Sequence, residues 1–132
     1  MKKMALFVIL FVALIALPMI LLSDGCMAYY QSLVDENPNG SMARWAQLRI
    51  AGTYLSTLRS EQAIEGYKKF LERYPDDPRR EWTHYRYCIS MDEGGKKQDA
   101  IDALQYFLEQ YPDSEYKLDV QGMLGRLKYV QK

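Results

Sequence analysis

The 132-residue chain has a single histidine and only two cysteines, Cys26 and Cys88. One histidine cannot build a metal site of the paired-histidine type, and two cysteines are too few for a disulfide framework. A nucleophile elbow and a phosphate-binding loop are also missing, because Gly94-Gly95-Lys96-Lys97 has neither the required spacing nor a preceding strand. These absences argue against an enzyme, and the sequence implies no metal and no cofactor.

The sequence also lacks an excess of either charge, with 17 basic and 17 acidic residues. A balanced chain produces no field that attracts nucleic acid, so we expect no nucleic-acid partner. We expect no small-molecule substrate either. His84 is interpreted as a packing or surface residue and Cys88 as a buried small hydrophobe. An enzymatic hypothesis would have to rest on these two side chains.

One long apolar run is present, from Met4 to Leu22, and it follows the pair Lys2-Lys3. As a helix with a rise of about 1.5 Å per residue it spans roughly 28 Å, close to the ~30 Å hydrocarbon core of a bilayer. The paired lysines favour a cytoplasmic N-terminus, and Tyr29-Tyr30 fall where an interfacial aromatic belt is expected. We therefore interpret residues 1–28 as a membrane anchor or signal segment, with the rest of the chain outside the cytoplasm.

Three interpretations of this segment remain open. It is a cleaved secretory signal, although such signals have a shorter apolar core of about 7–15 residues. It is a lipoprotein signal, because Leu22-Ser23-Asp24-Gly25-Cys26 resembles a lipobox and makes Cys26 a candidate lipid attachment site. In that motif Ser23 stands where Leu is usual, and Asp24 is also atypical. Or the segment is an uncleaved single-pass anchor, as its length favours.

A nine-residue segment occurs twice in the chain, 37 residues apart. Phe70–Pro78 reads FLERYPDDP, and Phe107–Glu115 reads FLEQYPDSE. Upstream of the two copies, Ala63-Ile64 matches Ala100-Ile101. Similarity at a fixed period of this length indicates stacked helical pairs, in which each unit buries its apolar face against its neighbour.

Helical periodicity and turn signals predict an all-α domain over residues 41–132. The predicted helices span residues 41–58, 60–74, 78–91, 98–111 and 114–130. Residues 29–40, which end in a run of Asp, Glu, Asn, Pro and Gly, are predicted to be a connector between this domain and the N-terminal segment.

The second helix of each pair repeats the order small residue, large apolar residue, packing residue and proline. Its members are Ala63, Tyr67, Phe70 and Pro75 in the first pair, and Ala100, Leu104, Phe107 and Pro112 in the second. This pattern resembles that of tetratricopeptide repeats, although Gln47 stands where that family prefers tryptophan. The repeat is also longer than the family's usual length of about 34 residues. We attribute the difference to a longer connector at Asp92–Gln98.

The resemblance covers residues 41 to about 130 and implies a short right-handed stack of two hairpins and a closing helix. The Tyr-Pro-Asp segments look most like the repeats of bacterial envelope proteins. These include the lipoprotein subunit of the outer-membrane β-barrel assembly machinery and the coordinator associated with the Tol-Pal system. It therefore implies a non-enzymatic adaptor or scaffold, tethered to a membrane of the bacterial envelope on its periplasmic side, whose partners are other envelope proteins. The alternative is a permanent accessory subunit of a respiratory, photosynthetic or secretion complex, with its N-terminal helix packed within that complex.

The resemblance also implies where partners bind, because in such arrays the first helix of each pair lines the concave face. A groove for an extended peptide or a partner helix would then be lined by some of Trp45, Arg49, Trp82, Tyr85 and Arg86. The alternative is that both tryptophans fill seams between helices. A second candidate is a basic group at the junction of the hairpins, which includes Lys69, Arg73 and Arg79. It would dock an acidic segment or a carboxylate, or it is an ordinary solvated surface.

Overall fold

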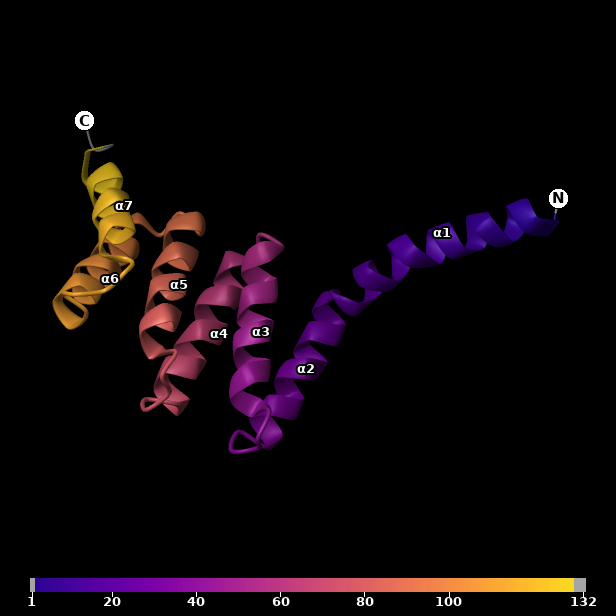
Figure 1. Ribbon diagram of the computed structural model, residues 1–132, viewed down its shortest axis with the longest axis horizontal. Helices are drawn as coiled ribbons and strands as arrows, with labels where there is room; N and C mark the ends of the chain where they lie inside the picture. The colour runs from indigo at the N-terminus through magenta and orange to yellow at the C-terminus, as the bar shows by residue number, and fades with distance from the viewer. Residues whose placement is uncertain (1, 130–132) are drawn as a thin grey trace. The chain divides into compact units, whose positions relative to one another are not determined.

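The computed structural model describes residues 2–129 and contains only α-helices and turns within that range (Figure 1). The predicted end of the last helix at Val130, and the predicted domain beyond it to residue 132, lie outside the described residues. The helices are α1 (Lys2–Leu21), α2 (Asp24–Glu36), α3 (Ala43–Ser56), α4 (Ser60–Arg73), α5 (Arg80–Glu93), α6 (Lys97–Gln110) and α7 (Lys117–Tyr129). The all-α prediction is confirmed. The chain divides into two compact units, one ending at Asn37 and one beginning at Pro38.

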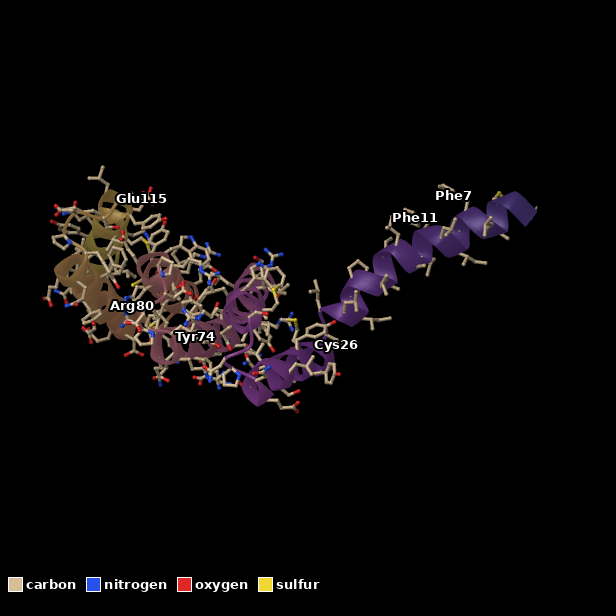
Figure 2. The ribbon with its side chains drawn as sticks, turned by 60° about the horizontal axis from the view of Figure 1, so that its bottom comes forward. Phe7, Phe11, Cys26, Tyr74, Arg80 and Glu115 are labelled. Carbon is tan, nitrogen blue, oxygen red and sulfur yellow. The ribbon has the colours of Figure 1, made fainter. Side chains whose placement is uncertain are left out.

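The first unit consists of α1 and α2. The stretch Met4–Leu21 forms a helix long and apolar enough to cross a membrane, a criterion that signal sequences also meet. Its side chains, Phe7 and Phe11 among them, stand out from the helix and are not buried by the rest of the chain (Figure 2). Pro18 lies near the end of α1, where a membrane helix tolerates it.

The connector predicted at residues 29–40 is shorter than expected. Tyr29 to Glu36 belong to α2, which buries Met27 and Val34, and the helix ends at Glu36. The physical reason is that the segment has no helix breaker before Pro38. Only residues 37–42 form the break before α3.

The second unit contains two hairpins, α3–α4 and α5–α6, and then α7. Each hairpin turns through a connector of equal length, residues 57–59 and residues 94–96. Attributing the long repeat to the Asp92–Gln98 connector was therefore wrong. The two hairpin turns share one geometry, in which Leu58 and Gly95 adopt positive φ angles of 60° and 69°. The six-residue connections between α4 and α5 and between α6 and α7 carry the Tyr-Pro segments.

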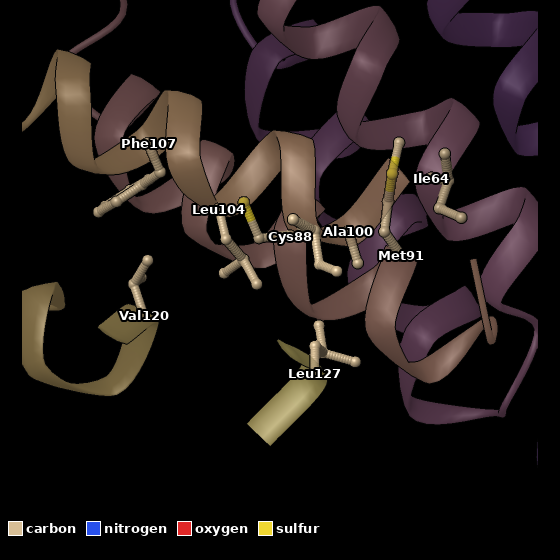
Figure 3. Packing of buried hydrophobic residues seen from close by; sticks show 9 residues of the cluster. Ile64, Cys88, Met91, Ala100, Leu104, Phe107, Val120 and Leu127 are labelled. Atoms are coloured by element: carbon tan, nitrogen blue, oxygen red, sulfur yellow. The ribbon is translucent and has the colours of Figure 1, made fainter. Parts of the chain in front are cut away.

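The repeated positions form the core of the hairpins. Six of them are fully buried, with 0% exposure: Ala63, Tyr67, Phe70, Ala100, Leu104 and Phe107. Burying a large apolar side chain contributes about 1.5–3 kcal/mol, so the repeat accounts for much of the stability. Figure 3 shows Leu104 and Phe107 beside Val120 and Leu127 of α7, in one cluster that also contains Cys88 and Met91.

Candidate partner-binding surface

The first helix of each hairpin carries a tryptophan with an arginine one turn later. On α3, the guanidinium carbon of Arg49 lies 5.7 Å from the centre of the Trp45 ring. On α5, the guanidinium carbon of Arg86 lies 5.8 Å from the centre of the Trp82 ring. Each arginine is thus within the range of a cation–π contact. Trp45 is 52% exposed and Trp82 is 36% exposed, so neither tryptophan only fills a seam.

Trp82 is held in place by the neighbouring helix α4. Its ring meets the edge of the Tyr67 ring, with 6.4 Å between the ring centres. Arg86 lies near the Trp82 ring, and its Nε–H donates to the Tyr67 hydroxyl over 3.4 Å. Because Tyr67 is fully buried, it is a rigid support for the exposed Trp82 and the half-buried Arg86. The structure therefore brings Trp82 and Arg86 together as one preformed patch.

Tyr85 occupies a different part of the surface, toward α7. Its ring stacks on that of Tyr116, with 4.4 Å between the centres, and its hydroxyl donates to Asp119 Oδ2 over 3.3 Å. Burial, with a further contribution from the Asp119 carboxylate, raises the pKa of Tyr85, so its hydroxyl keeps its proton. Tyr85 thus connects α5 to the connection and helix that follow α6.

Arg79, a predicted member of the basic group, binds a buried carboxylate and so stabilises the fold. Its Nε–H and its own backbone N–H donate to Asp77 Oδ1 over 2.9 Å, and its Nη2 donates to Asp77 Oδ2 over 3.0 Å. Arg44 reaches the same carboxylate from α3 over 3.3 Å. Asp77 is 4% exposed, and the hydrogen bonds from Arg79 lower its pKa to about 2. The other predicted members, Lys69 and Arg73, lie on α4, where Lys69 is half-buried and Arg73 is exposed.

A groove that sequence reasoning missed lies between α4 and α6, with α5 as its floor. It has a volume of about 440 Å³. Its lining residues are Lys68, Leu71, Glu72, His84, Tyr87, Cys88, Met91, Asp99, Asp102, Ala103 and Tyr106. Its lining residues come from three different helices, so no spacing along the sequence marks this groove.

The groove does not carry the chemistry of a catalytic pair. Burial lowers the pKa of His84 to about 4, with a smaller effect from Arg80, so its imidazole is neutral at pH 7. Its Nδ1 lies 2.8 Å from the Tyr111 hydroxyl. Burial raises the pKa of Cys88 to about 12, which leaves a thiol in place of the nucleophilic thiolate. Among the described residues, no group of His, Cys, Asp and Glu side chains could hold a metal ion.

Cys26, the candidate lipid attachment site, lies in the first turn of α2 and is half-buried with a free thiol (Figure 2). This residue is also where the match to a known family begins. A family model described as YfiO, outer membrane lipoprotein, matches residues 26–130. No curated protein matches the chain.

Proposed function

Because the chain belongs to the YfiO family of outer membrane lipoproteins, we propose that it is a tethered, non-enzymatic adaptor that binds other envelope proteins. Family membership assigns the protein to the bacterial envelope. The helical hairpins supply a preformed surface, and the N-terminal segment or its lipid holds that surface at a membrane. A tether raises the effective concentration of the domain for partners at the same membrane.

The proposed tether is a lipid on Cys26. The lipobox-like segment Leu22–Cys26, the apolar helix α1 and the start of the family match at Cys26 all support it. In this proposal residues 1–25 are removed and the domain remains on the periplasmic side.

The intact mass of the protein purified from membranes tests this tether. We expect a chain that begins at Cys26 and carries added acyl mass, whereas a Cys26→Ser variant should keep its N-terminal segment and gain no acyl mass. A wild-type chain that retains residues 1–25 without added mass would replace the lipid with an uncleaved anchor.

The proposed binding mechanism uses the patch formed by Trp82 and Arg86. A flat apolar or aromatic side chain of the partner packs on Trp82, and a partner carboxylate pairs with the Arg86 guanidinium. The observation that carries this proposal is the rigid support of both side chains by the buried Tyr67. Trp45 and Arg49, at the same position of the preceding hairpin, supply a second contact of the same kind.

Affinity capture from gently solubilised membranes, followed by native mass spectrometry, tests the patch. Replacing Trp82 and Arg86 by alanine should remove a partner that the wild-type protein retains, because aromatic and arginine anchors dominate binding energy. Tyr106→Ala is the control, since Tyr106 is a 47% exposed aromatic residue on α6, outside the patch. Equal loss of the partner from both variants would contradict a specific role of the patch.

The exposed apolar surface of α1 supports a second candidate function, a permanent subunit whose N-terminal helix packs against other membrane helices. The same native spectra separate the two functions. A stoichiometric complex that contains the full-length chain indicates the subunit, and an acylated chain that begins at Cys26 indicates the adaptor.

A further inference from the structure

The last described helix, α7, repeats the face with which α3 binds its partner helix. Two repeat lengths separate Gln121 from Gln47, Leu124 from Ile50, and Gly125 from Ala51. These three positions lie on one face of a helix, because they are spaced by three and four residues.

In α3, this face is the interface of the hairpin. Gln47 is fully buried, and its Nε2 donates to the carbonyl oxygen of Gly66 on α4 over 3.2 Å. Ala51 is also fully buried, and a Cβ added at Gly66 would lie 2.9 Å from the Ala51 Cβ. The two helices therefore approach closely at Ala51 and Gly66, and Gln47 and Ala51 have no exposed surface.

In α7, the described residues cover the same face only in part. Gln121 is exposed, Leu124 is half-buried, and a Cβ added at Gly125 would meet no atom within 4 Å. Together with Leu108, Lys128 and Tyr129, these residues line a groove of about 530 Å³, which we call the α7 groove. Val120 and Leu127 pack α7 on the rest of the domain (Figure 3), and Leu124 contacts the same core cluster with the part of its side chain that is not exposed.

We propose that the α7 groove binds an amphipathic helix of a partner protein, in the position that α4 takes on α3. The proposed interface repeats the register of the one formed between α3 and α4. A glutamine donor, a branched apolar residue and a small residue recur in the same order, and together they receive a closely packed helix. This inference rests on the proposed adaptor function and assigns a second surface to it.

The groove also specifies the chemistry of the helix that it binds. The helix presents glycine or alanine at the point facing Gly125, as Gly66 does on α4, and apolar residues one turn to either side, as Ala63 and Phe70 do. In an antiparallel hairpin, the first turn of the second helix lies beside the last turn of the first. An acidic residue in the first turn of the bound helix therefore lies near Lys128, as Glu61 on α4 would.

The probe is a labelled peptide with the sequence of residues 59–75, held helical by a lactam between Lys68 and Glu72. These two side chains are exposed on α4 and line the groove toward α6, so the lactam leaves the α3-facing side of the helix unchanged. Fluorescence anisotropy on the full-length chain in detergent micelles should show saturable binding. Gly125→Gln fills the α7 groove without a clash and should weaken binding by at least about tenfold, since the helices can no longer approach closely.

Gly122→Gln is the matched control. Gly122 also has no atom near an added Cβ, it lies on the same helix, and it does not line the α7 groove. Its affinity for the peptide should stay within about twofold of that of the wild-type chain. Absence of binding, or equal binding to both variants, would overturn the proposal. Self-association of the chain that Gly125→Gln abolishes would also overturn it, because the occupant would then be a second copy.

The affinity-capture experiment and the peptide-binding experiment together distinguish a failure of this inference from a failure of the proposed function. If the Trp82 and Arg86 variant loses its partner while the peptide does not bind, the α7 groove alone is wrong. If the peptide binds while the Trp82 and Arg86 variant keeps its partner, the α7 groove stands and the patch on α5 is wrong.

Discussion

Leu58 and Gly95 occupy equivalent positions in the two hairpin turns, and their backbones have nearly the same left-handed conformation. Both turns contain an equivalent backbone hydrogen bond. Arg59 N–H donates to Tyr54 O over 2.9 Å, and Lys96 N–H donates to Met91 O over 3.0 Å. Glycine adopts this conformation without steric cost, whereas a side chain bearing a Cβ costs about 1–2 kcal/mol.

We predict that Leu58→Gly stabilises the protein by about 0.5–1 kcal/mol, because relief of the left-handed strain exceeds the entropy cost of glycine. Leu58 is 86% exposed, so little burial is lost. Guanidinium unfolding followed by tryptophan fluorescence measures the change, since both tryptophans lie in the repeat helices. Gly95→Leu is the reciprocal variant and should be destabilising; stabilisation by it would refute the argument.

His84 makes the stability of the domain depend on pH. Its pKa is lowered to about 4 by burial, below its ordinary value of 6.5. Between these values the unfolded chain binds a proton that the native chain does not, so stability falls as the pH falls from 6.5 toward 4. We predict a loss of about 1 kcal/mol between pH 7 and pH 5, because His84 is only half-buried and solvent weakens the effect of its surroundings.

His84→Gln should remove this dependence, because glutamine does not titrate and already occupies the equivalent position on α3 as Gln47. Denaturation midpoints at pH 5 and pH 7 measure the effect. Tyr111→Phe is the control, since it removes the hydroxyl beside His84 Nδ1 and keeps the imidazole. The same pH dependence in wild type and His84→Gln would show that other groups cause it.

At the scale of elements, the six-residue connection between α4 and α5 is a structured joint. Tyr74 is buried and its hydroxyl donates to Pro38 O over 2.6 Å, while the Asp77 carboxylate binds Arg79 and Arg44. The connection between α6 and α7 is held by equivalent contacts from different residues. Ser114 Oγ accepts the backbone N–H of Tyr116 over 3.1 Å and donates to Glu81, which stands at the position of Arg44.

We predict that Asp77→Ala destabilises the protein by about 2 kcal/mol at pH 7, because it leaves Arg79 without its buried acceptor. Asp77→Ser should cost about 1 kcal/mol less, since serine accepts the equivalent backbone N–H in the connection between α6 and α7.

The pKa of Asp77 is lowered to about 2, so its contribution to stability is present above pH 3.8 and is lost as the pH falls toward 2. Thermal unfolding of the two variants at pH 7 and pH 3 checks both statements. Equal destabilisation by alanine and serine would argue against the backbone cap.

At the scale of the whole molecule, the second unit is an array in which stability depends on neighbours. α4 packs against both α3 and α5, whereas α7 is the last described helix and packs on α6. We predict that the backbone amides of α7 exchange at least about tenfold faster than those of α4, because helices at the end of an array open at lower free energy. Hydrogen-exchange mass spectrometry of the full-length chain measures this difference. Equal protection of the two helices would contradict the array description.

Much of the fold follows from patterns between nearby residues. Apolar spacing placed the five repeat helices within three residues of their observed starts and ends over the described residues, and the nine-residue repeat indicated the hairpins. The boundary at residues 29–36 and the cause of the repeat length were predicted wrongly. Residues 29–36 were predicted to be a connector although they are compatible with a helix, and they belong to α2. The length of the repeat was attributed to the connector between α5 and α6, which is no longer than the connector between α3 and α4.

The candidate surface was predicted less completely. Trp45, Arg49, Trp82 and Arg86 were predicted because the resemblance places the first helix of each pair on the partner-facing side. In the structure Trp45 pairs with Arg49, and Trp82 pairs with Arg86. The role of Arg79 in the joint was missed, because its partner Asp77 resembles an ordinary solvated turn residue in the sequence.

The sequence by itself determined the apolar N-terminal segment, the number of repeat helices and the repeated packing residues of the hairpins. These features depend on local composition and spacing. Only the tertiary structure decided which equivalent residues are covered. Gln47 and Gln121 share a residue type and a register, yet Gln47 is fully buried and Gln121 is exposed. Burial depends on whether another helix occupies the facing position, and a residue's own neighbours in the chain do not carry that information.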